Sequence, residues 1–330
     1  MGRTHHTHEK VDRALEASDE GIRAVKISLL GLLATAILQL FVVAVSNSVA
    51  LLSDTLHNFA DAATALPLWL AFWLSRRPPN ARYTYGYGRA EDIAGIFIVL
   101  VIAGSALLAG YEGISRLIDP SEVRNLPYVA VASIIGFAGN ETVAQYRIRV
   151  GRRIGSAALE ADGLHARTDG ITSLGVLLGA GGVALGLEWA DPAMGLLIAV
   201  AILLILKSAA RDVYHRLMDA TDPSLVSEVT DVLHTVDGVR RVDHARVRWI
   251  GHRLRAEVDV SVDDSLSVVE AHDIAEHAHH ELLHRIPRLH SALIHVNPMD
   301  AAGTDFHKRV AHHFETGGAR PGGGSPRGSE

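Results

Sequence analysis

The stretch DIAGIFIVLVIAGSALLAG, residues 92–110, is long and apolar enough to cross a lipid bilayer as a single helix. Comparable stretches lie on both sides of it, such as ISLLGLLATAILQLFVVAV at residues 27–45. Glycine and alanine run through these stretches and allow close packing of membrane helices. A soluble all-α protein would not need six such stretches in succession, so the sequence predicts a six-helix transmembrane bundle. The stretches cover residues 24–45, 48–75, 91–117, 126–147, 157–186 and 191–215.

The composition predicts a membrane part joined to a polar part. Of the 330 residues, 48% are hydrophobic and 21% are charged, and a chain of this length usually forms two domains. We expect a cytosolic N-terminal segment, a transmembrane domain, a cytosolic domain and a disordered tail rich in Gly, Pro and Ser. These parts cover residues 1–23, 24–217, 218–298 and 299–330. The polar, acidic N-terminus excludes a cleaved signal peptide.

Charge and cysteine content exclude several kinds of site. The formal net charge of −6 gives no indication of nucleic-acid binding, so no nucleic-acid partner is expected. The chain contains no cysteine, which excludes disulfides and thiolate metal sites. Any bound metal must therefore be held by nitrogen and oxygen, which disfavours Cu(I) and other soft ions.

Positive charges predict the orientation of the spans, because short loops rich in Lys and Arg stay in the cytosol. The connections after the second, fourth and sixth spans are basic, whereas the other loops carry few Lys or Arg residues. We therefore expect a multi-pass protein of the cell (cytoplasmic) membrane, held in the lipid bilayer with both termini in the cytosol. The basic residues are Arg76, Arg77, Arg82, Arg89, Arg147, Arg149, Arg152, Arg153, Lys207, Arg211 and Arg216.

Two copies of the pattern His-x-x-x-Asp lie inside these apolar stretches, His57 with Asp61 and His165 with Asp169. A four-residue spacing places both side chains on one face of a helix. Ionisable side chains in hydrocarbon are costly unless they have partners, and each copy offers the other such partners. Two such faces brought together would supply two nitrogen and at least two oxygen ligands, enough for a tetrahedral divalent metal ion.

The depth of the two copies in the membrane supports one shared site. Asp61 lies fifteen residues before Arg76, and Asp169 lies sixteen residues after Arg153. At about 1.5 Å per residue, both carboxylates lie roughly 22–24 Å from the cytosolic basic residues, on antiparallel spans. One copy alone would be equally consistent with a structural polar contact between helices. Two copies at matching depth favour a shared metal site.

The composition changes after Asp219 and predicts a small α+β domain. A helical pattern at residues 224–236 precedes two strands around the turn WIGHR, then a second helix at 267–286 and a strand at 291–298. The order αββαβ implies a ferredoxin-like sandwich in which helices cover one face of the sheet.

The residues around the two motifs resemble the cation diffusion facilitator family. The resemblance rests on SNSVALLSDTLHNFADAATALPLWLAFWLS at 46–75, YGYGRAEDIAG at 85–95 and SAALEADGLHARTDGITSLGVLLG at 156–179, and it extends from about residue 20 to 298. It implies a homodimeric, six-span metal/proton antiporter with a cytosolic ferredoxin-like domain. The transport site of the family falls on the four residues of the two motifs. These are His57, Asp61, His165 and Asp169.

The resemblance also implies which other family features this chain has. A second site, made by histidines in the loop after the second span, falls on Tyr83 and Tyr87, with Asn80 at the position of an acidic ligand. We therefore expect that loop site to be absent. Arg89 and Asp219 match a basic and an acidic residue that pair in family members, which predicts an interlock at the base of the spans.

The resemblance further implies metal ligands in the cytosolic domain. They map onto His244, Asp259, His272 and His295, while Asn297 takes a position that is acidic in the better-known pattern. Zn²⁺ bound there would be a regulatory ion. Surface histidines are abundant in this domain, so the alternative that these side chains are merely solvated stays open.

Several further polar residues have less defined roles. Asp54 lies one turn before His57 and is either a residue of the ion path or a hydrogen-bonding partner of a neighbour. We interpret Asn140, Glu141 and Asp162 as helix contacts or water-lining residues. The histidines of the HHTH segment at 5–8, and the pair His312 and His313, are interpreted as solvated.

Ligand chemistry favours zinc as the transported ion. Two imidazoles and two carboxylates suit tetrahedral Zn²⁺, whereas Mn²⁺ and Mg²⁺ prefer oxygen-rich sites of higher coordination. Fe²⁺, Co²⁺, Ni²⁺ and Mn²⁺ remain alternatives because ligand type alone does not set selectivity. Protons compete with metal for the same atoms, which predicts proton-coupled export from the cytosol.

Two other classes of protein fit these residues less well than an antiporter does. An intramembrane metallohydrolase needs an open metal position beside a base, and no His-Glu-x-x-His occurs. A metal sensor that does not transport would use the spans only as anchors, which does not explain ionisable residues at membrane depth. We therefore expect a secondary active transporter and no enzyme, with no organic cofactor.

Overall fold

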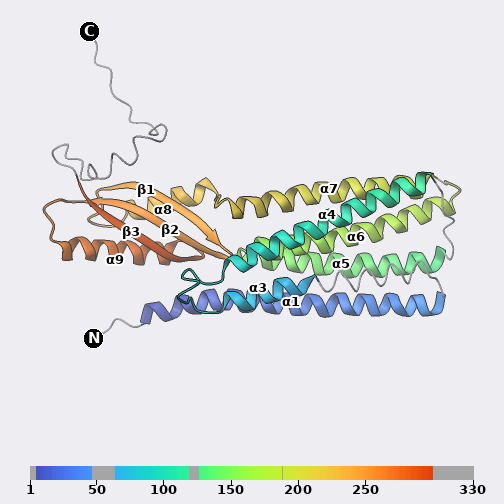
Figure 1. The fold of residues 1–330 in the computed structure, drawn as a ribbon, viewed down its shortest axis with the longest axis horizontal. Coiled ribbons are helices and arrows are strands. Elements are labelled where there is room, and N and C mark those ends of the chain that lie inside the picture. The colour runs from blue at the N-terminus through green and yellow to red at the C-terminus, as the bar shows by residue number, and fades with distance from the viewer. Residues whose placement is uncertain (1–4, 47–63, 119–125, 188, 300–330) are drawn as a thin grey trace, which may run out of the picture.

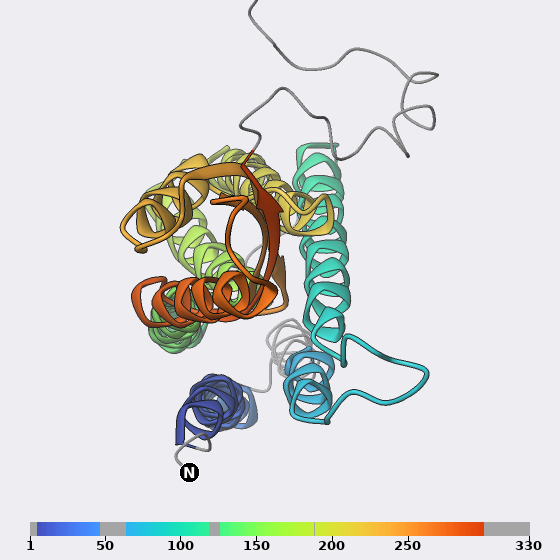
Figure 2. The ribbon, with the colours of Figure 1, turned by 90° about the vertical axis from the view of Figure 1, so that its left-hand side faces the viewer.

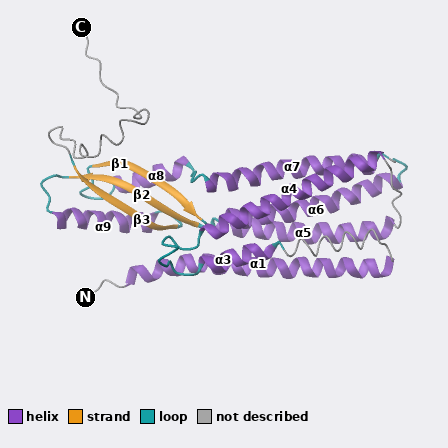
Figure 3. Ribbon diagram, viewed as in Figure 1, coloured by secondary structure: helices purple, strands orange, loops and turns teal. Residues whose placement is uncertain are grey.

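The protein consists of a long helical bundle and a smaller α/β domain at one end of it (Figure 1). The computed structural model describes residues 5–46, 64–118, 126–187 and 189–299. In the described residues the bundle consists of helices, and all the strands belong to the α/β domain (Figure 3). The predicted disordered tail lies almost entirely beyond the described residues.

The bundle helices run along the long axis of the molecule (Figure 1). In the part of the chain that the structure describes, three helical segments are long and apolar enough to cross a membrane, within α1, α4 and α7. Helix α3 is a shorter apolar helix at the end of the predicted second span. The helices are α1 (His5–Ser46), α3 (Ala65–Ser75), α4 (Arg89–Ile118), α5 (Leu126–Ile154), α6 (Ala157–Ala184) and α7 (Ala190–Leu217).

Helix α5 is longer than the predicted fourth span and includes residues that the sequence assigned to a loop. It continues to Ile154, so Arg147 is a helical residue rather than part of the cytosolic connection. Arg147 is 1% exposed and faces α6, where it pairs with an acidic side chain. Helix α1 likewise begins at His5, within the predicted N-terminal segment. Apolar length alone therefore underestimates helices whose ends are polar.

Helices α5 and α6 lie against each other over most of their length, and small residues bring their backbones together. At Gly163 a Cβ atom would lie 2.7 Å from Ile148 Cγ1 and 2.9 Å from the Ile148 backbone nitrogen. Such distances leave no space for a side chain. The helix that carries His165 is therefore held directly against the backbone of α5.

The C-terminal domain has the predicted αββαβ order, which confirms the α+β part of the fold class. It comprises α8 (Pro223–His234), β1 (Arg241–Ile250), β2 (Arg253–Val262), α9 (Val268–Arg285) and β3 (Leu289–Pro298). The sheet order is β1-β2-β3, with β1 antiparallel and β3 parallel to β2. Seen end-on, α8 and α9 lie on the same side of the sheet (Figure 2).

Alternation along β2 explains why one face of the sheet is covered. Leu254, Ala256, Val258 and Val260 are buried and form a core with α8 and α9, whereas the residues between them point to the other face. Side chains fix the start of each helix. Asp222 accepts from Ser224 N–H at α8, and a capping box begins α9.

Candidate metal site

One half of the predicted metal site lies in the described residues, on α6. His165 Nδ1 lies 3.8 Å from Asp169 Oδ1, one helical turn away. The His165 side chain is 2% exposed and that of Asp169 is 10% exposed. An imidazole and a carboxylate therefore share one buried helix face, as the spacing predicts.

Hydroxyl groups of the same helix surround this pair. Thr168 is buried, and its hydroxyl donates to the His165 carbonyl oxygen at 2.6 Å and lies 3.4 Å from Asp169 Oδ1. The Ser173 hydroxyl donates to the Asp169 carbonyl oxygen at 3.1 Å. Two of these contacts are to backbone carbonyls and one is to the Asp169 carboxylate, so hydroxyl groups lie next to the imidazole and the carboxylate of this turn.

The other half of the predicted site, His57 and Asp61, lies outside the described residues, and so does Asp54. Among the residues that are described, no three histidine or acidic side chains lie close enough together to hold a metal ion. As the predicted ligands, His165 and Asp169 would supply one nitrogen and one oxygen. A tetrahedral metal ion at this position would need two more groups.

Two ion pairs join α5 to α6 at this half-site: Asp162 of the first lies before His165 in α6, and Arg167 of the second lies between His165 and Asp169. Arg147 Nη1 lies 3.0 Å from Asp162 Oδ2, and both side chains are almost fully buried. Arg167 donates two hydrogen bonds to Glu141, at 2.9 and 3.2 Å. Asp162 and Glu141 thus make helix contacts, which is one of the two roles predicted for them. Asn140 is 3% exposed on the same face of α5.

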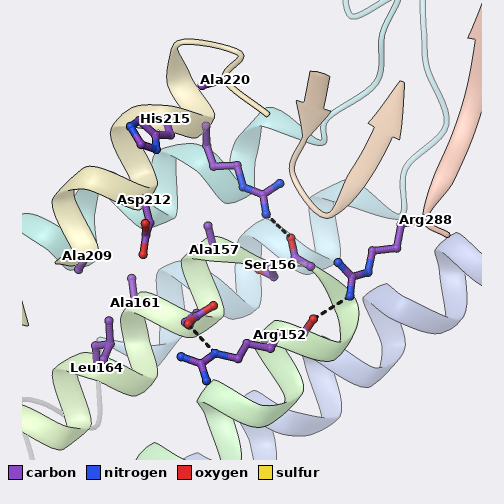
Figure 4. Close-up of a pocket in the computed structure, with 14 residues that line it drawn as sticks. Arg152, Ser156, Ala157, Ala161, Leu164, Ala209, Asp212, His215, Ala220 and Arg288 are labelled. Atoms are coloured by element: carbon purple, nitrogen blue, oxygen red, sulfur yellow. Dashed lines mark hydrogen bonds and ion pairs between the residues drawn. The ribbon is translucent and has the colours of Figure 1, made fainter. Parts of the chain in front are cut away.

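A pocket of about 370 Å³ lies at the base of α6 and α7 (Figure 4). Glu160, Asp212 and His215 line it together with arginines, and Arg152 donates to Glu160 at 2.8 Å. Leu164, which directly precedes His165, also lines the pocket. The pocket therefore reaches the level of α6 at which the half-site begins.

The loop after α3 brings its predicted positions into contact with one another. Asn80 Nδ2 donates to the Tyr87 hydroxyl at 2.7 Å, and the rings of Tyr83 and Tyr87 lie 4.7 Å apart. Asn80 Oδ1 accepts from the backbone N–H groups of Arg82 and Tyr83. The side chains of Asn80, Tyr83 and Tyr87 thus make contacts within the loop. The expected absence of a metal site there stays a prediction.

At the base of the bundle, Arg89 forms an ion pair with Asp219. Arg89 Nη2 lies 2.6 Å from Asp219 Oδ1, and Arg89 Nη1 lies 3.2 Å from Asp92 and 3.3 Å from the Arg216 carbonyl oxygen. The pair connects the start of α4 to the second residue after α7. Its role as an interlock stays a prediction.

Three of the four predicted cytosolic ligands lie side by side in the sheet. His244 pairs with Asp259 in the β1–β2 register, and Asp259 pairs with His295 in the β2–β3 register. His244 Nδ1 lies 3.7 Å from Asp259 Oδ2. The neighbours Val258, Ile294 and Val296 point into the core, so this row lies on the open face of the sheet.

The fourth predicted ligand, His272, lies apart from that row. It is exposed on α9, which covers the other face, and lines a surface pocket with Ile294 and Val296. Within one protomer, the sheet itself therefore lies between His272 and the row. Asn297, at the position of the missing acid, lies 3.4 Å from Asp243 Oδ2.

Comparison with known proteins identifies the family of this chain. Residues 25–218 match the cation efflux transmembrane domain, and residues 221–299 match the cation efflux protein cytoplasmic domain. The chain belongs to the cation diffusion facilitator family. It is a multi-pass membrane protein with a cytoplasmic C-terminal domain, and it is a cation efflux transporter of divalent metals rather than an enzyme.

Several relatives of this cation diffusion facilitator are similar along most of their length. A probable cation efflux system protein of Mycobacterium tuberculosis is 56% identical and covers 90% of each chain. The manganese efflux system protein MneP of Bacillus subtilis is 31% identical over 83% of this chain and 95% of its own. A solved MamM CTD variant is 25% identical, with a TM-score of 0.24, over 24% of this chain and 100% of its own.

Sequence reasoning missed several buried polar residues of this family member. Glu91 and His252 are 1% and 3% exposed and lie 2.5 Å apart, although 161 residues separate them in the chain. Glu91 was visible as a charge at the start of an apolar stretch, and His252 as a member of the turn WIGHR. Nothing in either pattern indicates that the two meet.

Proposed function

We propose that this protein exports Zn²⁺ from the cytosol in exchange for protons, as a homodimer in the cell membrane. The observation that carries the proposal is the buried pair of His165 and Asp169 on α6 of a cation efflux protein. In this proposal, His57 and Asp61 supply the remaining two ligands of the transport site. Both termini then lie in the cytosol.

The ligand set explains both the choice of ion and the coupling to protons. Two imidazoles and two carboxylates suit the tetrahedral geometry of Zn²⁺, whereas Mn²⁺ prefers more oxygen ligands. Zn²⁺ binding requires a neutral imidazole and an ionised carboxylate, so protons and metal compete for His165 and Asp169. Protonation of the outward-facing site releases the metal, and deprotonation toward the cytosol allows it to bind again.

The route from the cytosol to the site passes the base of α6. The pocket at this end of the helix places the carboxylates of Glu160 and Asp212 among three arginines, Arg152, Arg216 and Arg288. The cytoplasmic domain serves as the dimer contact. The row of His244, Asp259 and His295, with His272 from a second protomer, would hold a regulatory Zn²⁺.

Manganese export is the second candidate, because MneP is named a manganese efflux protein. Another relative, 30% identical over 72% of this chain, is named a cadmium, cobalt and zinc/H(+)-K(+) antiporter. The relatives therefore differ in their metals, and resemblance does not choose among Zn²⁺, Mn²⁺, Fe²⁺, Co²⁺ and Ni²⁺. The ligand chemistry favours zinc.

The test is a panel of divalent metals in proteoliposomes that carry a pH gradient. Wild-type protein should transport Zn²⁺ with accompanying proton flux and prefer it to Mn²⁺. The variant with both Asp61→Ala and Asp169→Ala should be reconstituted into liposomes as efficiently as wild type and should transport no metal. His57→Asp, which replaces nitrogen by oxygen, should shift preference toward Mn²⁺.

Three outcomes would contradict the proposal. Transport that survived the double Asp variant would refute the transport site. A wild-type preference for Mn²⁺ over Zn²⁺ would refute the ligand argument. Metal binding without flux in wild type would favour a sensor that does not transport.

A further inference from the structure

Five polar side chains from the bundle and the cytoplasmic domain meet in a buried cluster where the two parts join. We call it the junction cluster. Its members are at most 4% exposed, although each carries a group that hydrogen-bonds strongly. They come from four bundle helices or their ends and from the turn between β1 and β2. The members are Ser18, Ser75, Glu91, Ser156 and His252.

Glu91 is the centre of the junction cluster. Its Oε1 lies 2.5 Å from His252 Nδ1 and 3.2 Å from the Ser75 hydroxyl. Its Oε2 accepts from the Ser156 hydroxyl at 3.1 Å. On the far side of the imidazole, His252 Nε2 lies 3.4 Å from the Ser18 hydroxyl. One carboxylate and one imidazole therefore connect α1, α3, α4 and α6 to the cytoplasmic domain.

The β1–β2 turn is built for this close approach. Gly251 has a φ of +59°, and a Cβ there would lie 2.7 Å from the Gly88 carbonyl oxygen and 3.0 Å from Glu91 Oε1. Two arginines bridge the same contact. Arg216 Nη1 donates to the Gly251 carbonyl oxygen at 3.4 Å, and Arg253 Nη2 donates to that of Ser75 at 3.2 Å.

Because the junction cluster is buried, its side chains depend on one another for hydrogen bonds. A buried carboxylate or imidazole is costly unless hydrogen bonds replace its hydration, so each member depends on the others. If the turn moved away, Glu91 and His252 would both lose a partner in an apolar setting. The junction cluster thus fixes the position of the β1–β2 turn against the bundle, and the hydrogen bond from Arg288 to the Arg152 carbonyl oxygen is a separate contact between the two parts.

The Ser156 contact reaches the helix that carries the half-site. Ser156 is the N-cap residue of α6, where its side chain accepts from the Leu159 N–H group. The same hydroxyl donates to Glu91. A displacement of His252 therefore acts through Glu91 on the first turn of α6, and His165 and Asp169 lie further along that helix.

We propose that His252 and Glu91 are positioning residues that couple the cytoplasmic domain to the α6 half-site through Ser156. This inference rests on the proposed function in one respect, since it takes His165 and Asp169 to belong to the transport site. The pair contacts no transported ion. It sets the rate at which α6 changes position rather than the affinity for metal.

The test uses variants of His252 that separate its two nitrogens. His252→Asn retains a donor near the Nδ1 position and thus the Glu91 contact, whereas His252→Gln places its amide near the Nε2 position, toward Ser18. His252→Ala removes both contacts. His277→Ala, on the exposed face of α9, is the matched control. Each variant is made in the full chain and reconstituted in liposomes.

Two quantities are measured for each protein. The first is Zn²⁺ flux, resolved into its maximal rate and the concentration at half-maximal rate. The second is the distance distribution between spin labels at Arg149→Cys in α5 and Asp237→Cys in the cytoplasmic domain. Both positions are exposed, and the chain has no cysteine that would compete for label.

We expect His252→Ala and His252→Gln to lower the maximal rate roughly fivefold or more, with an unchanged half-maximal concentration and a broader label distance. His252→Asn and His277→Ala should stay within about twofold of wild type.

If His252→Ala did not fold, the comparison of His252→Asn with His252→Gln would still decide. Equal behaviour of Asn and Gln, or wild-type rates and distances in His252→Ala, would overturn the coupling. Absence of flux in wild type would refute the proposed function instead, and the label distances would still test the attachment.

Discussion

At the scale of single residues, Arg147 and Asp162 form the most deeply buried ion pair among the described residues of the bundle. Their side chains are 1% and 0% exposed, and Arg147 Nε and Nη2 have no hydrogen-bond partner in the described structure. Removing one partner leaves the other charge unpaired in an apolar setting. Arg147→Met and Asp162→Leu should therefore each destabilise the protein by about 3–5 kcal/mol.

The double variant separates pairing from packing. With both charges replaced by apolar side chains, most of the lost stability should return, because no buried charge remains. Melting temperatures of the detergent-solubilised protein measure this. Arg152→Met provides the control, since Arg152 pairs with Glu160 but is 69% exposed, and the change there should be below about 1 kcal/mol. Additive losses in the double variant would contradict this account.

Asp243 predicts a pH dependence in the cytoplasmic domain. Partial burial acts to raise the pKa of Asp243, but hydrogen bonds from Ser261, Arg241 and Asn297 outweigh it and hold that pKa below its usual value. A carboxyl whose pKa is lowered by folding stabilises the protein above its unfolded pKa, and this stabilisation is lost as the pH falls through the folded pKa. Asp243→Asn should thus lower the melting temperature at pH 7.

The difference from wild type should shrink once the pH falls below about 4, the ordinary pKa of an aspartate. Thermal unfolding of the full chain at pH 7 and at lower pH measures both differences. Asp264→Asn, at an exposed position of the same domain, controls for the loss of one negative charge. A gap between Asp243→Asn and wild type that stayed constant with pH would refute the role of ionisation.

The sequence predicted residue roles where the chemistry is local. The spacing of His165 and Asp169 alone places both on one helix face, and the structure agrees. The sequence predicts for Asp162 a helix contact or a water-lining role but not its partner, because Arg147, at the end of the predicted fourth span, has the pattern of a basic loop residue. A charge near the end of an apolar stretch has the same pattern whether it faces water or a buried acid on a neighbouring helix.

At the scale of helices, the α5–α6 contact can be tested at two glycines of one helix. At Gly163 a Cβ would lie 2.9 Å from the Ile148 backbone nitrogen, which cannot move independently, whereas at Gly181 nothing lies within 4 Å. Gly163→Ala should therefore force α6 away from α5 and lower both the melting temperature and Zn²⁺ flux.

Gly181→Ala is the matched control and should act with the opposite sign. Alanine in a helix is favoured over glycine by roughly 0.5–1 kcal/mol when space allows, so stability should rise slightly and flux should persist. The two variants are compared by melting temperature and by transport in the same liposomes. Equal effects at the two glycines would mean that close packing at Gly163 does not position α6.

Helix existence was predictable from the sequence, whereas helix partners were not. Apolar length indicated every bundle helix that the structure describes, and period-two alternation indicated the strands. Helices α5 and α6 carry the polar residues Glu141, Arg147, Asp162 and Arg167, which pair with one another across the contact. The turn at 250–253 was also predicted, but its contact with Glu91 depends on how two domains dock, and hydropathy carries no information on docking.

At the scale of the whole molecule, the two domains meet through contacts of different strength. The junction cluster is buried and hydrogen-bonded, whereas Arg89 and Asp219 are 41% and 40% exposed. An ion pair with this exposure contributes about 1 kcal/mol or less to stability. We therefore expect the ion pair to fix the position of α4 relative to the end of α7 rather than to stabilise the fold.

A double-mutant cycle on this pair tests the interlock. Arg89→Gln and Asp219→Asn should each leave the melting temperature nearly unchanged but lower the maximal Zn²⁺ flux several-fold, because either change frees the base of α4 from the end of α7. The double variant should transport no worse than either single one, since both remove the same contact. Arg248→Gln, whose Nη1 lies 3.8 Å from Asp219, should have the smaller effect. If the losses of flux were additive, Arg89 and Asp219 would act separately, and the ion pair between them would not be an interlock.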